Sequence, residues 1–118
     1  FLQWFVGFSD AESNFFINPT LKKDKVTISS FSFMFKITLH KDDVGVLKYI
    51  HNKLNIGNVR LSSNECIFNI TDKEGIKILI SIFDKHNLNT TKYLDYLDFK
   101  KAFYLYINRE KKIENWIS

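Results

Sequence analysis

The sequence is poor in cysteine, proline and glycine, with one Cys, one Pro and four Gly among 118 residues. The single cysteine, Cys66, has no second cysteine in the chain with which to form a disulfide. It lies in an alternating apolar stretch, where a free cysteine usually packs as a small hydrophobic residue. No Pro/Gly/Ser-rich linker divides the chain. We therefore expect one domain over residues 1–118, with Cys66 in its core.

Long hydrophobic runs are also missing. No segment approaches the roughly 18 consecutive apolar residues that a membrane-spanning helix needs, and no basic region precedes an apolar one at the N-terminus. The given sequence therefore carries no sign of a membrane partner. A hydrophobic content of 45%, including twelve Phe, is far from the charged, core-poor composition of disordered chains.

The charge of the chain is mildly basic. A formal net charge of +4 and a pI of about 9.1 favour an anionic partner. The excess is small compared with a chain that coats nucleic acid nonspecifically. Charge alone therefore makes nucleic acid only a somewhat favoured partner.

The spacing of apolar residues predicts the secondary structure. A period near four predicts helices and a period of two predicts strands, in the order helix, strand, strand, helix, strand, strand, helix, helix. The predicted elements are an apolar, buried helix over residues 2–12, strands 14–22 and 30–39, a helix ending at 54, strands 58–62 and 66–71, a helix ending at 83, and a helix over about 93–106.

Turn and cap residues mark the ends of these elements. Pro19 predicts a bulge or an edge position in the first strand, because proline cannot donate to a sheet ladder. Asp42 and Asp43 are candidate caps of the second helix, and Gly57 is its expected stop. Residues 71–72 are candidate caps of the third helix.

The element order predicts an α+β fold of αββαββα type, with a four-stranded antiparallel sheet backed by helices on one face. The other face is polar. Asn, Lys, Arg, Ser and Thr side chains can reach phosphates and base edges, and a two-stranded ribbon fits the major groove of DNA. An ordinary solvent-exposed face is the simpler alternative. The side chains assigned to the polar face are Asn14, Phe16, Asn18, Thr20, Lys22, Ser30, Ser32, Met34, Lys36, Thr38, Asn58, Arg60, Ser62, Ile67, Asn69 and Thr71.

One segment of the first helix resembles a known family. It resembles the signature helix of the LAGLIDADG homing endonucleases and is similar to their organellar, group I intron-encoded type. The element order matches that fold along the whole chain, and two later segments look like its landmarks. The segments that carry the resemblance are Phe5-Val6-Gly7-Phe8-Ser9-Asp10-Ala11-Glu12-Ser13, Phe35-Lys36-Ile37-Thr38-Leu39-His40 and Asn89-Thr90-Thr91-Lys92.

The resemblance implies a site-specific DNA endonuclease that reads double-stranded DNA with its polar sheet face. It implies that Glu12 binds a divalent cation, Mg²⁺, and that Lys36 and Lys92 lie near the cleavage centre. Oxygen ligands around Mg²⁺ suit phosphodiester hydrolysis. Asp10 resembles the structural acid of the motif, which we expect to fix a cap or a loop. Ser13 stands where the motif usually ends in Gly, which puts its tight turn in question.

The resemblance also implies a second partner helix. Gly7 and Ala11 lie one helical turn apart on one face, so two such helices could approach closely there. We expect this domain-interface helix to use Phe5, Gly7, Phe8 and Ala11. The rest of the chain has no second motif of this kind, so this chain alone should not cut DNA.

The assembly has two alternatives. The chain opens on Phe1 without an initiator Met, so we expect it to be the N-terminal half of a two-motif protein, with the tail 108–118 leading toward the second domain. A homodimer is the competing assembly. The alternative function is a non-catalytic RNA- or DNA-binding protein, such as an intron maturase or ribonucleoprotein component, with intron RNA as its partner. The family and the Asn, Lys, Ile and Phe bias suggest a fungal-type mitochondrial product.

Overall fold

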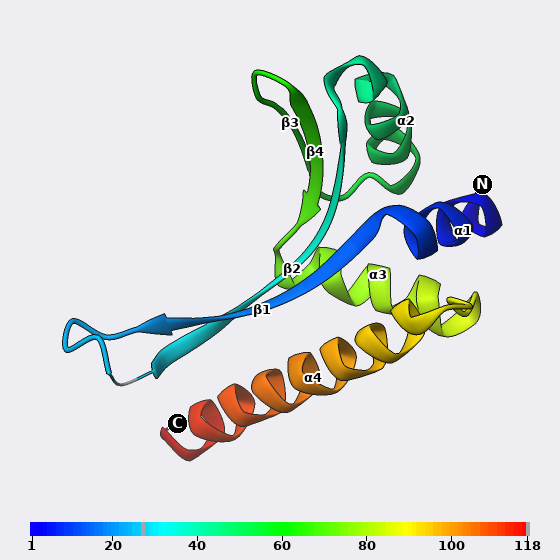
Figure 1. The fold of residues 1–118 in the computed structure, drawn as a ribbon. Helices are drawn as coiled ribbons and strands as arrows, with labels where there is room; N and C mark the ends of the chain where they lie inside the picture. Colours follow the sequence, from blue (N-terminus) through cyan, green and yellow to red (C-terminus); the bar gives the residue numbers. More distant parts are fainter. Residues whose placement is uncertain (27, 118) are drawn as a thin grey trace.

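The helices and strands follow one another in the predicted order (Figure 1). The structure is a computed structural model that describes the backbone of residues 1–26 and 28–117 and the side chains of residues 1–26 and 30–109. It confirms the α+β fold. The elements are α1 (Leu2–Glu12), β1 (Ser13–Leu21), β2 (Ile28–His40), the 3-10 turn η1 (Lys41–Asp43), α2 (Val44–Leu54), β3 (Asn58–Leu61), β4 (Glu65–Ile70), α3 (Lys73–Lys85) and α4 (Thr91–Ile117).

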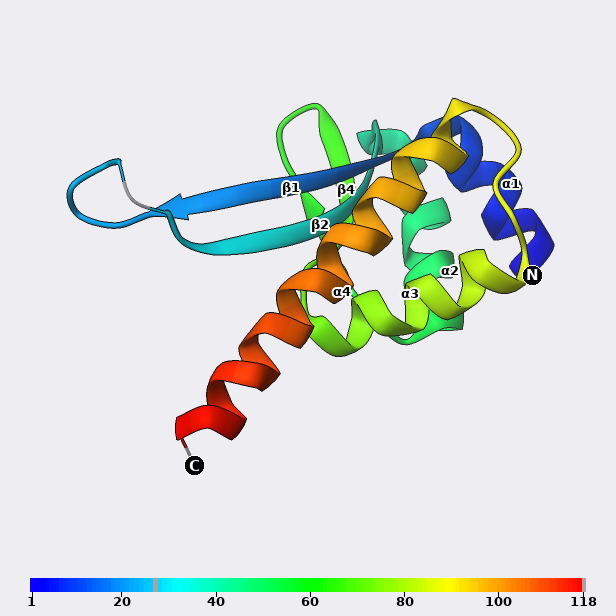
Figure 2. The ribbon, with the colours of Figure 1, turned by 90° about the horizontal axis from the view of Figure 1, so that it is seen from below.

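The sheet is antiparallel throughout, with strand order β1-β2-β4-β3. Its apolar face follows from the two-residue alternation that the sequence displays. In β2, Phe33, Phe35 and Ile37 are buried, and in β4 Cys66 and Phe68 are buried with them. The helices pack on this face, as Figures 1 and 2 show for α3 and α4. The predicted core position of Cys66 is confirmed, and burial raises the pKa of its thiol.

The first strand lies at one edge of the sheet, as Pro19 predicts. Pro19 pairs with Phe31 of β2, and the register shifts between Thr20 and Leu21. At its other edge β1 has no neighbouring strand in the described residues. The β1–β2 ribbon extends well beyond the shorter β3–β4 hairpin, which gives the sheet one long arm (Figure 1).

Phe83 of α3 lies at the centre of the core and connects several elements. Its ring is stacked on Phe5 of α1, with 5.9 Å between ring centroids. It lies 5.8 Å from the ring of Phe35 in β2 and 5.3 Å from that of Tyr96 in α4. Aromatic pairs at these separations add to the stability gained by burial. Phe83 therefore joins α1, the sheet and α4, beside a direct contact between Phe5 and Phe35 at 6.2 Å.

Helix ends differ from the sequence predictions in two places. The Asp42 and Asp43 side chains do not cap the second helix; the Nδ1 atom of His40 instead accepts a hydrogen bond from the Asp42 N–H at 3.2 Å. The stop of α2 is Asn55, with a left-handed φ of 57°, and not Gly57. Asn tolerates this conformation because its short side chain can hydrogen-bond locally.

Gly57 is required for a different reason, because it lies in the connection to β3 with a φ of +80°. A Cβ placed there would lie 2.6 Å from the Asn69 carbonyl oxygen, so only glycine fits. The third helix begins as predicted, since the Asp72 carboxylate accepts a hydrogen bond from the Gly75 N–H at 2.9 Å.

The last helix is longer than predicted. The apolar period supports a helix only to about Tyr106, whereas α4 continues to Ile117. The predicted tail 108–118 is therefore helical where its backbone is described, and the side chains of residues 110–118 lie outside the described set. Among the described residues, no helix is long and apolar enough to cross a membrane.

A polar cluster joins α4 to α3. The Lys100 Nζ lies 2.7 Å from Asp84 Oδ2, and the Tyr96 hydroxyl lies 2.7 Å from Asp84 Oδ1 and 3.0 Å from the Ile80 carbonyl oxygen. Partial burial raises the pKa of the Asp84 carboxyl, but the hydrogen bonds from Lys100 and Tyr96 outweigh it. The net pKa is therefore lower than usual.

We expect Asp84→Asn to lower the free energy of unfolding by about 1 kcal/mol at pH 7, a modest value because the ion pair is partly exposed to solvent. The folded pKa of Asp84 is depressed, so its contribution is present above the unfolded pKa near ~4 and is lost as the pH falls through the folded value. Urea unfolding at pH 7 and pH 3 measures this difference.

The exposed Asp98 of α4 provides the matched control, because Asp98→Asn removes the same charge without touching the cluster. It should change the unfolding free energy by less than about 0.5 kcal/mol at either pH. An Asp84→Asn effect of equal size at both pH values would contradict the account of this cluster.

Candidate nucleic-acid interface and helix seam

The polar side chains form one continuous face because the strands pair in register. Asn14 of β1 pairs with Lys36 of β2, and Lys36 pairs in turn with Asn69 of β4. Asn69 also pairs with Asn58 of β3. Cross-strand partners in a sheet point to the same side. One row of four nitrogen-bearing side chains therefore crosses the whole sheet.

Further rows continue the face in both directions. On the long ribbon, Asn18 pairs with Ser32, and Phe16 pairs with Met34. At the other end, Ile67 pairs with Thr38 on one side and Arg60 on the other. The register places the predicted strand residues together on one face, which now has a definite order.

Three of the predicted face residues lie just outside the strands. Lys22 follows the last residue of β1, and Ser62 lies in the β3–β4 turn, where its Oγ lies 3.2 Å from the Glu65 carbonyl oxygen. Thr71 follows β4 and lines a hollow beside Phe33 and Phe103, on the side covered by helices. The two-residue alternation stops at Ile70, where the chain turns into α3, and the assignment of Thr71 to the DNA-binding face stays a prediction.

Helix α1 has two distinct faces. Its inner face buries Phe5, Val6 and Ser9. Phe5 is completely buried against Phe83, so its prediction as a domain-interface residue is wrong. The outer face carries Trp4, Gly7 and Ala11 at spacings of three and four residues, all exposed.

No contact in the described part of this chain requires a glycine at position 7. A Cβ placed at Gly7 would meet no atom within 4 Å, and its backbone is helical. Glycine inside a helix costs about 1 kcal/mol relative to alanine. Gly7 therefore lowers the stability of the helix without being needed for packing within the described chain. A glycine at such an exposed position would allow the backbone of another helix to approach closely.

Aromatic side chains border this outer face. Trp4 is 44% exposed and Tyr49 of α2 is 46% exposed, and their ring centroids are 5.8 Å apart. Phe8 is partly buried, and its ring stacks on Trp4 at 5.2 Å. Sequence analysis does not identify Trp4 or Tyr49. Trp4 is recognisable from its helical spacing to Gly7 and Ala11, but Tyr49 has no such signal because it comes from another helix.

The C-terminal end of α1 is tied to the loop before α4. The Asp10 carboxylate accepts hydrogen bonds from the backbone N–H groups of Asn89 and Thr90 at 3.3 Å and from the Thr90 hydroxyl at 2.8 Å. This confirms that Asp10 fixes a loop. Its oxygens are occupied by these donors.

Ser13 makes the transition from helix to strand without glycine. Its φ of −96° and ψ of 163° are ordinary extended values, and its Oγ donates to the Ser9 carbonyl at 2.6 Å. The buried Ser13 thus satisfies a carbonyl of the last helical turn. The departure from the motif's usual Gly is therefore accommodated.

Glu12 is an exposed carboxylate at this helix end. Within the described side chains it has no hydrogen-bond or ion-pair partner. The Lys92 Nζ donates a hydrogen bond to the carbonyl of Ser13, which is the residue after Glu12, and lies 3.5 Å from Asn14 Oδ1. Lys36 is the cross-strand partner of Asn14, and its Nζ lies 5.8 Å from the centre of the Phe16 ring. The predicted Glu12, Lys36 and Lys92 therefore belong to one corner of the molecule.

These residues fit one half of a divalent-cation site. A carboxylate is the ligand type that Mg²⁺ prefers, and Glu12 is accessible while Asp10 is occupied. In the part of the chain that the structure describes, no group of three or more His, Cys, Asp or Glu residues could hold a metal ion.

Known proteins are similar to this chain in sequence and in fold. The family model of the LAGLIDADG endonuclease matches residues 5–103. The probable intron-encoded endonuclease Cox1-I1b of Schizosaccharomyces pombe is 38% identical over 105 residues, which cover 87% of this chain and 27% of that protein.

Two solved structures have the same fold. The LAGLIDADG homing endonuclease I-GzeII, in complex with its DNA target, superimposes with a TM-score of 0.83 and 36% identity over 92% of this chain and 37% of its own. I-SmaMI, bound to uncleaved DNA target in the presence of calcium ions, has a TM-score of 0.84 and 29% identity over 93% of this chain and 38% of its own. The chain spans about a quarter of the curated relative's length, since it covers 27% of it.

The outer face of α1 yields a stability prediction for the chain by itself. We expect Gly7→Ala to raise its free energy of unfolding by about 1 kcal/mol, because the added methyl group meets only open space and alanine favours the helix. The reverse change at the neighbouring exposed position, Ala11→Gly, should lower it by a similar amount. Urea denaturation of the two variants measures both changes. A destabilised Gly7→Ala chain would show that the glycine serves this chain's own fold.

Proposed function

Because the chain belongs to the LAGLIDADG endonuclease family, we propose that it is one half of a site-specific DNA endonuclease. The observation that carries the proposal is the outer face of α1, where Gly7 faces open space next to an exposed Glu12. Glycine at position 7 lowers the stability of the helix, and Glu12 has no partner among the side chains that the structure describes. If a second helix of the same kind packs against α1, Gly7 allows the two backbones to approach closely and Glu12 lies beside the equivalent acid of the second helix.

The seam is formed by Gly7 and Ala11, flanked by Trp4 and Phe8. Small residues one turn apart let two helix backbones approach closely, and the aromatic side chains then pack along the borders of the contact. The second helix comes from another LAGLIDADG domain in the same protein or from a homodimer partner. The first arrangement is favoured, because this chain spans only 27% of its curated relative.

The metal site is shared across the seam. Glu12 supplies one carboxylate, and the equivalent acid of the second helix supplies the other. A divalent cation held there, Mg²⁺ in our proposal, would neutralise charge on the phosphate and lower the pKa of an attacking water. A solved relative bound to uncleaved DNA in the presence of calcium ions supports a divalent cation.

Two lysines act beside this acid. Lys92 is held near the Ser13 carbonyl and the Asn14 amide oxygen, which places its ammonium group at the junction of α1 and β1. Lys36 projects from the sheet position opposite Asn14. Their role is to orient the water and to stabilise negative charge that develops on the phosphate.

The polar sheet face binds double-stranded DNA through the major groove. In the row from Asn14 to Asn58, the side chains of Asn14, Lys36 and Asn58 offer amide and ammonium groups that can bond both phosphates and base edges, whereas Asn69 is buried. The relative I-GzeII, solved in complex with its DNA target, supports this partner. The long β1–β2 arm extends the face and suits a long target site.

The cellular location that we propose is the mitochondrion. A relative named as an intron-encoded endonuclease supports an intron origin. The abundance of Asn, Lys, Ile and Phe codons in AT-rich organellar genes suits the composition of this chain, which includes twelve Phe. Localisation of a tagged complete protein would test this.

The functional test compares the complete natural protein with its Glu12→Gln variant on the intron-insertion sequence in the presence of Mg²⁺. Loss of the carboxylate charge should abolish cleavage while DNA affinity stays within a few-fold, because the sheet face is unchanged. Gel-based cleavage and fluorescence anisotropy measure the two properties. Normal cleavage by the Glu12→Gln protein would contradict the metal-binding role of Glu12. Tight RNA binding without any DNA cleavage by the unmodified protein would contradict the proposed nuclease activity.

A charge-matched pair of variants separates binding from cutting in the same assay. Arg60→Gln removes a positive charge from the sheet face, whereas Lys85→Gln removes one from the end of α3. Arg60→Gln should reduce the slope of log affinity against log salt by about one, and Lys85→Gln should leave it unchanged. Equal effects would show that binding depends on net charge and not on the sheet face.

A further inference from the structure

The outward face of α4 carries a regularly spaced stripe of leucine, tyrosine, lysine and asparagine side chains that the proposed nuclease function does not use. Successive members are separated by three and four residues in turn, which is the spacing of a coiled-coil seam. Leu94 and Leu105 are each 62% exposed, a large value for leucine. The members are Leu94, Leu97, Lys101, Tyr104 and Asn108, with Leu105 beside them.

The stripe is separate from the candidate site. The opposite face of α4 is buried in the core through Tyr96, Phe99, Phe103 and Ile107. Because α4 packs on the apolar side of the sheet, its outward face points away from the polar face (Figures 1 and 2). DNA on the sheet would therefore leave the stripe accessible.

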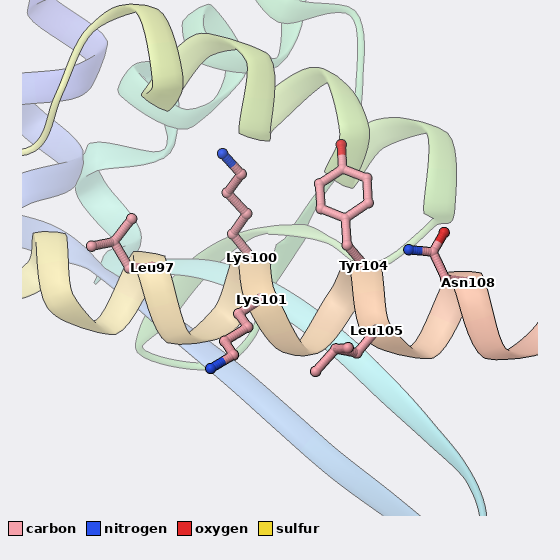
Figure 3. A pocket seen from close by; sticks show the side chains of 6 residues that line it. All are labelled: Leu97, Lys100, Lys101, Tyr104, Leu105 and Asn108. Atoms are coloured by element: carbon pink, nitrogen blue, oxygen red, sulfur yellow. The ribbon is translucent and has the colours of Figure 1, made fainter.

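A hollow of about 440 Å³ follows the middle of the stripe (Figure 3). In the figure, Lys100 points toward α3, where its Nζ pairs with Asp84 at 2.7 Å. Lys101 points to the other side of α4. It makes no ion pair with any side chain that the structure describes. The stripe thus has one unpaired cation in its centre.

The position of Lys101 disfavours a second copy of this stripe as the partner. Lys101 lies seven residues from both Leu94 and Asn108. A parallel pairing in register and an antiparallel pairing about the centre both place Lys101 against the Lys101 of the other copy. Like charges in contact at the centre of a seam oppose association.

We propose that this stripe docks an amphipathic helix of another protein, with apolar residues at the same spacing and a carboxylate at its centre. The leucines supply the apolar contact, and Lys101 selects the partner by charge. Nucleic acid fits less well, because Leu94 and Leu105 offer it no polar contact and the exposed carboxylate of Asp98 lies on the flank of the stripe.

The test uses a fluorescent designed helical peptide of about three heptads, with leucine at the seam positions and Glu at the central one. Its partner peptide differs only by Lys at that central position. Anisotropy titrations with the complete natural protein, in which the outer face of α1 is proposed to be covered, should show at least about tenfold tighter binding of the Glu peptide. Lys101→Glu should reverse the preference, and Leu97→Ser should weaken both peptides. Lys85→Glu, which makes the same charge change at the exposed end of α3, should change neither.

Several outcomes would overturn the proposal. Equal affinity of the unmodified chain for both peptides would remove the role of Lys101, and this comparison needs no variant to fold. Tighter binding of an RNA hairpin than of the Glu peptide, lost in Lys101→Glu, would assign the stripe to nucleic acid. Sedimentation that shows self-association abolished by Leu97→Ser would assign it to a second copy. None of these results depends on DNA cleavage.

Discussion

The structure depends on helix α1, which packs into the core on one side and is exposed on the other. Phe5 packs against Phe83, and Val6 and Ser9 are buried on the same face, while Trp4, Gly7 and Ala11 are exposed on the outside. A helix that is apolar on most sides belongs in an interior. Here only half of that interior is present, because one side of α1 is exposed. The chain therefore folds around α1 but does not enclose it, and the second domain that we propose would complete the enclosure.

The end of the same helix brings the proposed chemistry and the proposed recognition surface together. Asp10 holds the loop before α4, and Lys92 from that helix reaches back to the Ser13 carbonyl. Glu12 therefore projects from a segment fixed on both sides, and Asn14, the first member of the polar row across the sheet, follows two residues later. A shift of α1 would move both features at once.

The sheet could be predicted from the sequence because a period of two admits one arrangement of buried and exposed side chains. Residues 30–39 show this, with Phe33, Phe35 and Ile37 buried as expected. Helix α1 is harder to predict, since apolar residues on nearly all sides do not reveal which side faces the core, and the sequence prediction puts the buried Phe5 on the wrong face. The cap at His40 and the stop at Asn55 depend on local backbone geometry. The role of Glu12 rests on family resemblance, because a lone exposed carboxylate has no chemical signature of its own.

The most direct test of this account measures whether the outer face of α1 is covered in the complete natural protein. A cysteine introduced as Ala11→Cys can be labelled with a maleimide, and the modified peptide can be quantified by mass spectrometry. The fully buried Cys66 provides an internal reference for an inaccessible thiol. The account predicts rapid labelling at position 11 in the 118-residue chain and labelling nearly as slow as that of Cys66 in the complete protein. Equally rapid labelling of position 11 in both proteins would contradict it.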